Sequence, residues 1–192
     1  MIGEGFANDE LPGGIGVGKP RKLLGMPTSP YAVSLMRLME TQSRETIAAW
    51  CAAYAQAHVL PIYENAYPGD KRPAAALAAA RRWFSGEVAF RDVKNIILND
   101  CHAAAREAEK SPAAQAAARA CGQAAACYHT PAHALGFAGY AAAAILYQRL
   151  GVNRDAETYD QAAAGEFAKM EEAFRAMTAA DESQPATIGR NS

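Results

Sequence analysis

The chain has 192 residues and a formal net charge of −1, from 19 basic and 20 acidic side chains. Alanine supplies 46 of the residues, whereas aromatic side chains make up only 8%. Because alanine is the strongest helix former, this composition argues against an all-β fold, and the balanced charge gives no global field that would favour nucleic acid or an anionic membrane.

The N-terminal 28 residues are rich in glycine and proline, with seven of the first and three of the second. We expect residues 1–28 to be a flexible arm that orders only by lying on another part of the protein. Nothing in the first residues resembles an export signal, and the longest weakly polar stretch, 132–147, is too short to span a membrane. The protein is therefore expected in the cytoplasm, with its four cysteines reduced and each buried as a small apolar side chain.

Cap residues and prolines mark the first predicted helices. One begins at Ser29-Pro30, with Ser29 as its cap. A second covers residues 44–60, where apolar side chains recur every three or four positions until Pro61 kinks the chain or restarts the helix. A third follows Asp70, which is placed to cap it, and ends at Ser85-Gly86.

Two further helical segments are predicted before the last one. The first spans residues 89–110. The second, 112–150, is either kinked at Pro131 or broken there, with Thr130 as the cap of a new helix.

The last predicted helix spans residues 156–180 and carries a narrow apolar seam. The members of the seam are Phe167, Met170, Phe174 and Met177, at three- and four-residue spacing. Such a seam is suited to docking on a neighbour, so a homo-oligomer through this helix is one expectation. Residues 181–192 are expected to be a frayed tail.

No segment alternates apolar and polar residues, and no Asn-Gly hairpin signal is present. The sequence therefore predicts an all-α fold: a compact, alanine-rich bundle of about six helices, one of them kinked or broken at a proline. These helices are expected to form a single domain over residues 29–180.

Three motifs come close to known sites without completing them. Residues 13–20 almost fit the phosphate-binding loop G-x-x-x-x-G-K-[ST], but Pro20 stands where the hydroxyl that holds magnesium is needed. His129 and His133 share a helical face as weak metal candidates, yet no H-E-x-x-H or C-x-x-C pattern supplies the further ligands that zinc needs. No Glu-x-x-His pair for two irons and no nucleophile elbow occurs, so neither a cofactor nor a catalytic residue is predicted.

Larger side chains inside the alanine-rich helices are candidates for binding. Arg119 lies just before Gly122, whose small size lets another helix approach, so a buried and paired Arg119 is expected. Trp50 and Trp83 are expected core anchors, although an exposed tryptophan would be a candidate hot spot of an interface.

Eight segments then follow one another in the order of a known family: 50–52, 58–64, 67–73, 79–83, 86–87, 102–108, 118–123 and 128–136. Their more specific parts are the D-x-R-P turn that begins at Asp70, the R-x-W helix that ends at Trp83 and the H-x-x-x-H-A helix that begins at His129. Over about residues 44–147 the pattern resembles the immunity-protein-five-like domain family, a helical family tied to bacterial polymorphic toxin systems. The family usually has a histidine where this chain has Gln123, and the glycine-rich arm and the C-terminal helix lie outside the resemblance.

The resemblance implies a protein that binds and neutralises a cognate toxin, without catalysis of its own. The residues leave open an alternative of another class: a metal- or small-ligand-binding protein or enzyme, with a pocket between helices lined by Asp70, Arg72, His102, His129 and His133. Neither nucleic acid nor a membrane is expected as a partner. The candidate pocket or partner-binding residues are Asp70, Arg72, Trp83, His102, Arg119, His129 and His133.

Overall fold

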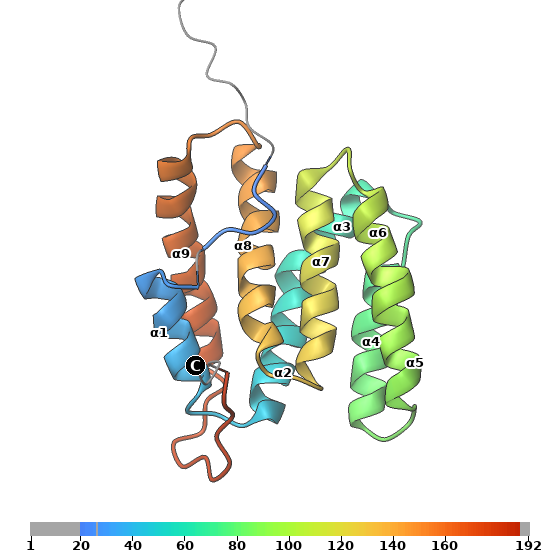
Figure 1. Cartoon of the computed structure of the whole chain (residues 1–192), viewed down its shortest axis with the longest axis vertical. Coiled ribbons are helices and arrows are strands. Elements are labelled where there is room, and N and C mark those ends of the chain that lie inside the picture. Colours follow the sequence, from blue (N-terminus) through green and yellow to red (C-terminus); the bar gives the residue numbers. More distant parts are fainter. Residues whose placement is uncertain (1–19, 26, 189–192) are drawn as a thin grey trace, which may run out of the picture.

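The structure, a computed structural model, describes residues 20–25 and 27–188. Across these two ranges the chain forms seven continuous helices and no strand, with the helices standing side by side (Figure 1). The predicted all-α bundle is therefore confirmed, with one helix more than the six or so expected.

The helices follow in chain order, and two of them contain a π-helical turn. The first four elements are α1 (Pro30–Met39), α2 (Arg44–Tyr54), the π-turn η1 (Ala55–Val59) and α3 (Leu60–Ala66). The next four are α4 (Arg72–Phe84), α5 (Phe90–Asn95), the π-turn η2 (Ile96–Cys101) and α6 (His102–Glu107). The last three are α7 (Pro112–Cys127), α8 (His133–Leu150) and α9 (Ala156–Arg175). Elements α2, η1 and α3 form one continuous helix, as do α5, η2 and α6.

The helix that contains Pro61 continues through the proline instead of ending there. Proline has no amide hydrogen for the carbonyl four residues earlier, and its ring crowds that carbonyl. The chain widens into the π-turn just before Pro61, where the Leu60 amide donates to the carbonyl of Ala55, five residues back. This wider turn lets the helix run on to Ala66, six residues past its predicted end.

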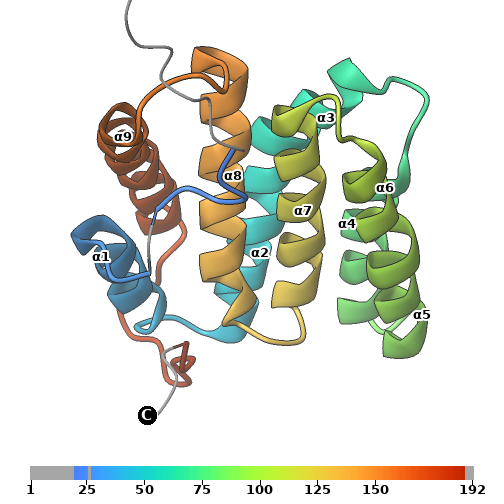
Figure 2. The same ribbon diagram turned by 45° about the horizontal axis from the view of Figure 1, so that its top comes forward.

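At Pro131, by contrast, the helix breaks, which accounts for the additional helix. The amides of His133 and Ala134 donate to the carbonyls of Thr130 and Pro131, at 3.1 and 2.9 Å. Ala132 occupies the N-cap position and no side chain caps the helix, so the predicted cap at Thr130 is wrong. The break reverses the chain, and α7 and α8 form a hairpin (Figure 2).

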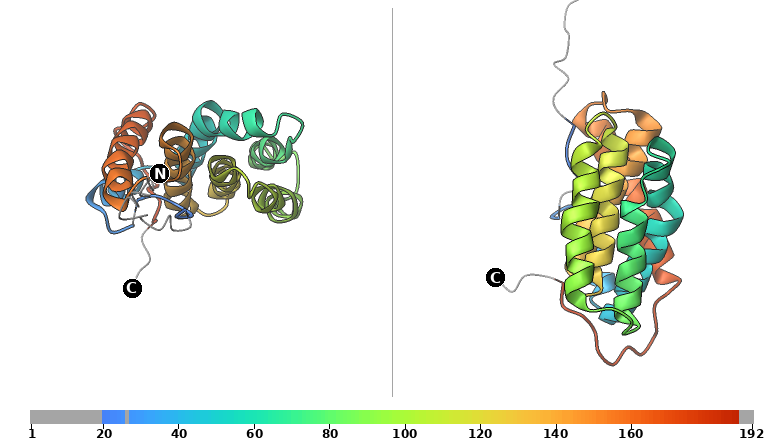
Figure 3. Two further views of the ribbon diagram at one scale, coloured as in Figure 1. Left: turned by 90° about the horizontal axis from the view of Figure 1, so that it is seen from above. Right: turned by 90° about the vertical axis from the view of Figure 1, so that its right-hand side faces the viewer.

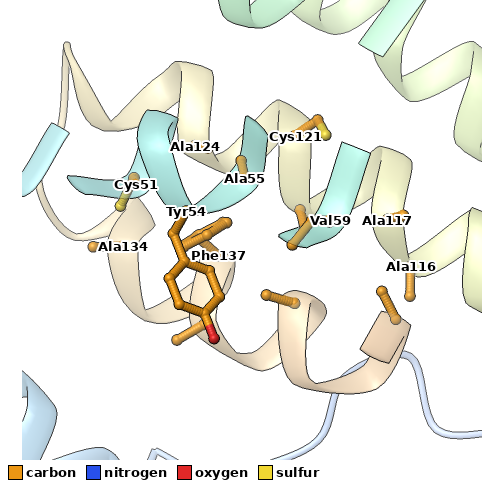
Figure 4. Packing of buried hydrophobic residues seen from close by; sticks show 14 of the residues in the cluster. Cys51, Tyr54, Ala55, Val59, Ala116, Ala117, Cys121, Ala124, Ala134 and Phe137 are labelled. Carbon is orange, nitrogen blue, oxygen red and sulfur yellow. The ribbon is translucent and has the colours of Figure 1, made fainter. Parts of the chain in front are cut away.

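Helix α7 lies at the centre of the molecule, between α8 on one side and α6 on the other (Figures 1 and 3). Its side chains are mostly alanines that are buried on several faces, so neighbouring backbones approach closely. A few large rings fill the remaining space: Trp50 meets Phe137 and Phe174 edge-on, with centroids 5.5 and 5.3 Å apart. Figure 4 shows Phe137 and Tyr54 among small side chains of this core.

All four cysteines are free and buried, as predicted. They are Cys51, Cys101, Cys121 and Cys127. Burial raises the pKa of the Cys101 thiol to about 12 and the pKa values of Cys51 and Cys121 above their usual range. These thiols therefore act as small apolar side chains.

Residues 20–25 of the predicted arm pack across α8 and α9 (Figures 1 and 2). Leu24 is fully buried, and its amide donates to the carbonyl of Gly139 at 3.1 Å. The Tyr147 hydroxyl donates to the carbonyl of Arg21 at 2.6 Å. Gly25 takes a φ of +83° against the ring of Phe167, a conformation that side chains rarely allow. Of the phosphate-loop-like segment 13–20, residues 13–19 lie outside the described part of the chain.

The C-terminal segment also packs where a frayed tail was expected. Helix α9 ends at Arg175, and the chain turns back to the loop between α1 and α2. There the amide of Ala186 donates to the carbonyl of Gln42 at 2.8 Å, and the amide of Ile188 donates to a Glu40 carboxylate oxygen at 3.1 Å. Ile188 is only 5% exposed, so residues up to 188 belong to the folded part.

The apolar seam of α9 is used inside the chain. Phe167, Met170 and Phe174 are buried, in a helix that packs against α1, α2 and α8, whereas Met177, beyond its end, is 42% exposed. Oligomerisation through this helix stays a prediction, but three of the four side chains that suggested it are buried within the chain. Within the described residues, no helix combines the length and the apolar character needed to cross a membrane.

Candidate functional site

Three of the predicted site histidines meet in one pocket of about 240 Å³, which we call the histidine pocket. His102 begins α6, His129 follows the last turn of α7 and His133 begins α8. Helices α6, α7 and α8 follow one another across the molecule (Figure 1), so residues far apart in the sequence reach one place. The other lining residues are Phe90, Lys94, Ile97, Leu98, Gly122, Gln123 and Ala126.

Two of these imidazoles are positioned by α7. Nδ1 of His133 lies 2.8 Å from Oε1 of Gln123; because an amide oxygen only accepts, Nδ1 is the donor in this bond. His102 lies over Gly122, where an added Cβ would be 3.1 Å from Nε2 of the ring. The small residue thus lets an imidazole of α6 lie directly on α7.

Burial and nearby positive charge keep these two rings neutral. Burial lowers the pKa of His102, and the positive charges of Arg106 and Arg119 lower it further. Burial also lowers the pKa of His133, with a smaller effect from His129. At pH 7 both rings are therefore mainly uncharged hydrogen-bonding groups.

The described histidines do not form a metal centre with other ligands. Zinc sites need three or four nitrogen, sulfur or oxygen ligands that converge. Among residues 20–25 and 27–188, no group of three or more His, Cys, Asp or Glu side chains is placed to hold a metal ion. The structure therefore offers no third ligand to the weak candidates His129 and His133.

Asp70 and Arg72 lie in a separate network at the turn between α3 and α4. Nε and Nη2 of Arg72 donate to the two carboxylate oxygens of Asp70 at 3.0 and 2.7 Å, and the Tyr63 hydroxyl donates to the same carboxylate at 2.6 Å. Nη2 of Arg72 also donates to Glu107, at the end of α6, at 2.5 Å. These bonds hold the pKa of Asp70 well below its usual range, with Arg72 as the main cause.

The pocket of five residues that the sequence suggested is therefore divided. The three histidines come together, whereas the polar atoms of Asp70 and Arg72 bind one another and their neighbours. The Asp70–Arg72 turn ties α3, α4 and α6 together. Asp70 also accepts a hydrogen bond from the backbone amide of Arg72 at 3.0 Å. It therefore does bind the first turn of α4, the helix that it was expected to cap.

Arg119 lies in a hollow beside the histidine pocket. Its guanidinium carbon is 5.9 Å from the centroid of the Tyr140 ring, and the side chain is half-buried. Within the described part of the chain it forms no ion pair, so the paired and buried arginine expected from the sequence is instead a half-buried arginine over an aromatic ring. The hollow, of about 240 Å³, is lined by His102, Ala105, Arg106, Arg119, Gln123 and Tyr140.

A third hollow, of about 480 Å³, continues from Arg106 and Arg119 to the docked arm. Its charged lining residues are Arg21, Lys22, Arg106, Glu109 and Arg119. We call the second and third hollows together the basic groove. Arg106 and the arm residues were missed from the sequence.

One signal in the sequence points to part of this groove. His102 and Arg106 are four residues apart, and so are Arg119 and Gln123, so each pair shares one face of its helix. The contribution of Arg21 and Lys22 has no such signal, because it depends on where the arm docks.

Aromatic rings that are wholly or partly exposed border the histidine pocket. We define the aromatic patch as Trp83, Phe84, Phe90 and His129, of which Phe84 and His129 are exposed and the other two half-buried. His129 stacks on Phe90 with centroids 4.1 Å apart and meets Trp83 edge-on at 6.2 Å. Phe84 is 46% exposed, and its ring lies on the buried ring of Tyr128, with centroids 5.1 Å apart. Trp83 is half-buried, so part of the ring expected in the core is available at the surface.

Comparison with known families identifies the class of protein to which this bundle belongs. The family described as Imm-5 like putative immunity protein matches residues 37–173, which is more than half of the chain. The chain belongs to this family. The match includes α9 as far as residue 173, so the expectation that the C-terminal helix lies outside is wrong. No curated protein and no solved structure matched in the other two comparisons.

Proposed function

We propose that this protein is an immunity protein that binds a cognate toxin and neutralises it without catalysis of its own. Membership of the immunity-protein family is the observation that carries the proposal. We also propose that it acts in the cytoplasm of the cell that makes the toxin.

The surface next to the histidine pocket is suited to such binding. Tight interfaces combine buried aromatic and arginine anchors with a polar surround. The aromatic patch supplies the rings, the basic groove supplies the arginines, and the histidine pocket shares lining residues with both. Exposed apolar side chains grouped in this way are typical of contact surfaces.

The alanine-rich core supports the same role, because it presents these anchors on a rigid frame. An alanine side chain has no rotamers to lose, and α7 is packed on several faces. Groups that are already in place before binding lose less entropy when the complex forms.

Each predicted site residue has a place in this proposal. Trp83, His129 and His133 would contact the toxin through the aromatic patch and the histidine pocket. His102 and Arg119 would do so from the groove. Asp70 and Arg72 would act indirectly, by holding α4 and α6 in position.

A small polar ligand in the histidine pocket is the second candidate, because three imidazoles and Gln123 line one pocket. At about 240 Å³ this pocket is smaller than most ligand sites, which enclose roughly 300–1,000 Å³. We therefore favour the toxin, for which this pocket would receive a single side chain.

Binding of the cognate toxin would test the proposal. We expect the purified chain and the toxin to elute as one complex in size-exclusion chromatography, and co-expression to restore growth of cells that carry the toxin.

Two exposed apolar side chains in this region and one elsewhere give a matched comparison. Phe84 and Leu98 are each 46% exposed, and Met177, just beyond the end of α9, is 42% exposed. We expect Phe84→Ser and Leu98→Ser to weaken the complex by about tenfold or more, the loss typical of an interface anchor, and Met177→Ser to leave it unchanged. A wild-type chain that neither binds the toxin nor protects cells would contradict the proposal.

A further inference from the structure

The basic side chains of this protein differ in whether they have an ion-pair or hydrogen-bond partner. Most described arginines and lysines bond to a carboxylate or a carbonyl group, whereas seven have neither an ion pair nor a hydrogen bond to another described residue. The seven are Lys22, Arg37, Arg91, Lys94, Arg106, Lys110 and Arg119. Four of them line the basic groove or the histidine pocket: Lys22, Lys94, Arg106 and Arg119.

The three hollows form one continuous furrow. The third and second share Arg106 and Arg119, and the second and the histidine pocket share His102 and Gln123. The furrow thus follows α7 from Pro112 to His129, which is about 25 Å at 1.5 Å per helical residue. An extended peptide of about seven or eight residues has that length.

The chemistry changes along the furrow. Toward the docked arm the lining holds Lys22, Arg106 and Arg119, and the acid there is Glu109. Toward α5 the lining is mostly apolar, with the neutral imidazoles of His102 and His133 and one exposed cation, Lys94. An occupant that complements both ends carries negative charge at one end and an apolar side chain at the other.

We propose that the furrow binds an extended acidic segment of a protein partner. Carboxylates of that segment would bond to Arg106 and Arg119, which suit carboxylates because guanidinium groups bind them in pairs of hydrogen bonds, and to Lys22. One apolar or aromatic side chain would fill the histidine pocket. The identity of the partner rests on the proposed function.

Nucleic acid fits the furrow less well. A strand would place phosphates along its whole length, whereas the end formed by Phe90, Ile97 and Leu98 is apolar. Glu109 lies in the basic part and would oppose a continuous phosphate backbone.

The test uses the full chain and a library of random eight-residue peptides. We expect the bound peptides to be enriched in Asp and Glu, with one apolar or aromatic residue toward one end. The most enriched peptide, with a fluorescent label, is then titrated by anisotropy beside a version in which its Asp and Glu are replaced by Asn and Gln. We expect the neutral version to bind at least tenfold more weakly, and the acidic one to lose affinity between 50 and 300 mM salt, because exposed charges are screened.

Matched variants locate the binding. Arg106→Gln with Arg119→Gln removes two unpaired cations of the furrow, and Arg37→Gln with Arg91→Gln removes two outside it. We expect the first pair to weaken peptide binding at least tenfold and the second pair to leave it unchanged. If the first pair does not fold, as judged by circular dichroism, Lys22→Gln makes the same test on an exposed side chain of the basic end.

Several results would overturn the inference. These are a library without acidic enrichment, equal losses in both pairs of variants, and displacement of the peptide by lower concentrations of a thymidine oligonucleotide. Binding that appears only after removal of residues 1–19 would also overturn it, because the occupant would then be this chain's own segment.

The toxin separates this inference from the proposed function. If the wild-type chain and the Arg106→Gln, Arg119→Gln variant bind the toxin equally, the furrow is not the contact and only this inference fails. If the chain binds acidic peptides through the furrow but not the toxin, the proposed function fails and the chemistry of the furrow stands.

Discussion

Among single residues, Asp70 is the one whose hydrogen bonds connect the most neighbouring groups of the α3–α4 turn. Its carboxylate accepts bonds from Tyr63, from the guanidinium of Arg72 and from the Arg72 backbone amide. The side chain is only 19% exposed, so water does little to replace these partners. Asp70 therefore fixes the turn that sets α4 against α3, and through Arg72 it also fixes the end of α6.

We predict that Asp70→Asn lowers the free energy of unfolding by about 2 kcal/mol, because hydrogen bonds to a charged, partly buried group are lost. Urea unfolding at pH 7, followed by circular dichroism, measures this. Glu64→Gln is the control: its partner Lys71 is 65% exposed, so the change should stay within about 0.5 kcal/mol. Equal effects of the two substitutions would contradict the role given to Asp70.

The same carboxylate predicts how stability depends on acid. Arg72 holds the folded pKa of Asp70 below the value of about 3.9 for an unfolded aspartate. Its stabilisation is therefore complete above about pH 4 and is lost as the pH falls through the folded pKa. The difference between wild type and Asp70→Asn should shrink between pH 4 and pH 2, and a difference that stays constant would argue against this ion pair.

His102 and His133 predict a second pH dependence, nearer neutrality. The groups that face them are Arg106, Arg119, His129 and Gln123, and none carries negative charge. Their folded pKa values lie below about 6.5, so their contribution to stability is complete above that pH and declines as the pH falls below it.

NMR titration of the ring protons tests this directly. We expect both histidines to titrate below pH 6.5 in the free protein and to shift upward when an acidic peptide occupies the furrow. His102→Gln should flatten the decline in stability between pH 6.5 and pH 5. A pKa of His102 above 6.5 in the free protein would contradict the surroundings described for it.

At the scale of helices and loops, local signals predicted the element boundaries well where a cap or a break decides them. Helices α2 and α7 begin at residues 44 and 112, as predicted, where the side chains of Ser43 and Ser111 cap them, and the break at Pro131 was one of two alternatives. The π-turns could not be predicted, because one extra residue in a helical turn leaves the apolar spacing nearly unchanged. The packing of Leu24 and Ile188 was also missed, since one or two apolar residues in a short segment carry no periodic signal.

The docked arm gives a test at this scale. A Cβ atom at Gly139 would lie 3.2 Å from the backbone oxygen of Leu24, which cannot move aside without moving the arm. We predict that Gly139→Val releases residues 20–25 from α8. The Leu24 amide, which bonds to the Gly139 carbonyl, should then exchange its hydrogen at least tenfold faster.

A nearby substitution serves as its control. Tyr147→Phe removes only the hydroxyl bond to Arg21, so exchange at Leu24 should increase less than in Gly139→Val. Unchanged exchange in the valine variant would show that the arm is not held by this contact.

In the molecule as a whole, the candidate site is assembled from segments that are far apart in the sequence. The sequence named three histidines and Arg119 but grouped them with Asp70 and Arg72, which the fold places in another network. Arg106 and the arm residues complete the groove only after α6 and the arm have packed on their neighbours. The net charge of −1 also concealed the groove, because acidic side chains elsewhere balance its local excess of cations.

The most direct test of the central claim is titration of the cognate toxin with this protein while the toxin's activity is measured. We predict that activity falls linearly and reaches its minimum at one molecule of this protein per toxin, because a rigid surface blocks the toxin by forming a stoichiometric complex. Activity that persists at a tenfold excess would contradict the account, and so would activity that is lost at far less than one equivalent, as an enzyme acting on the toxin would cause.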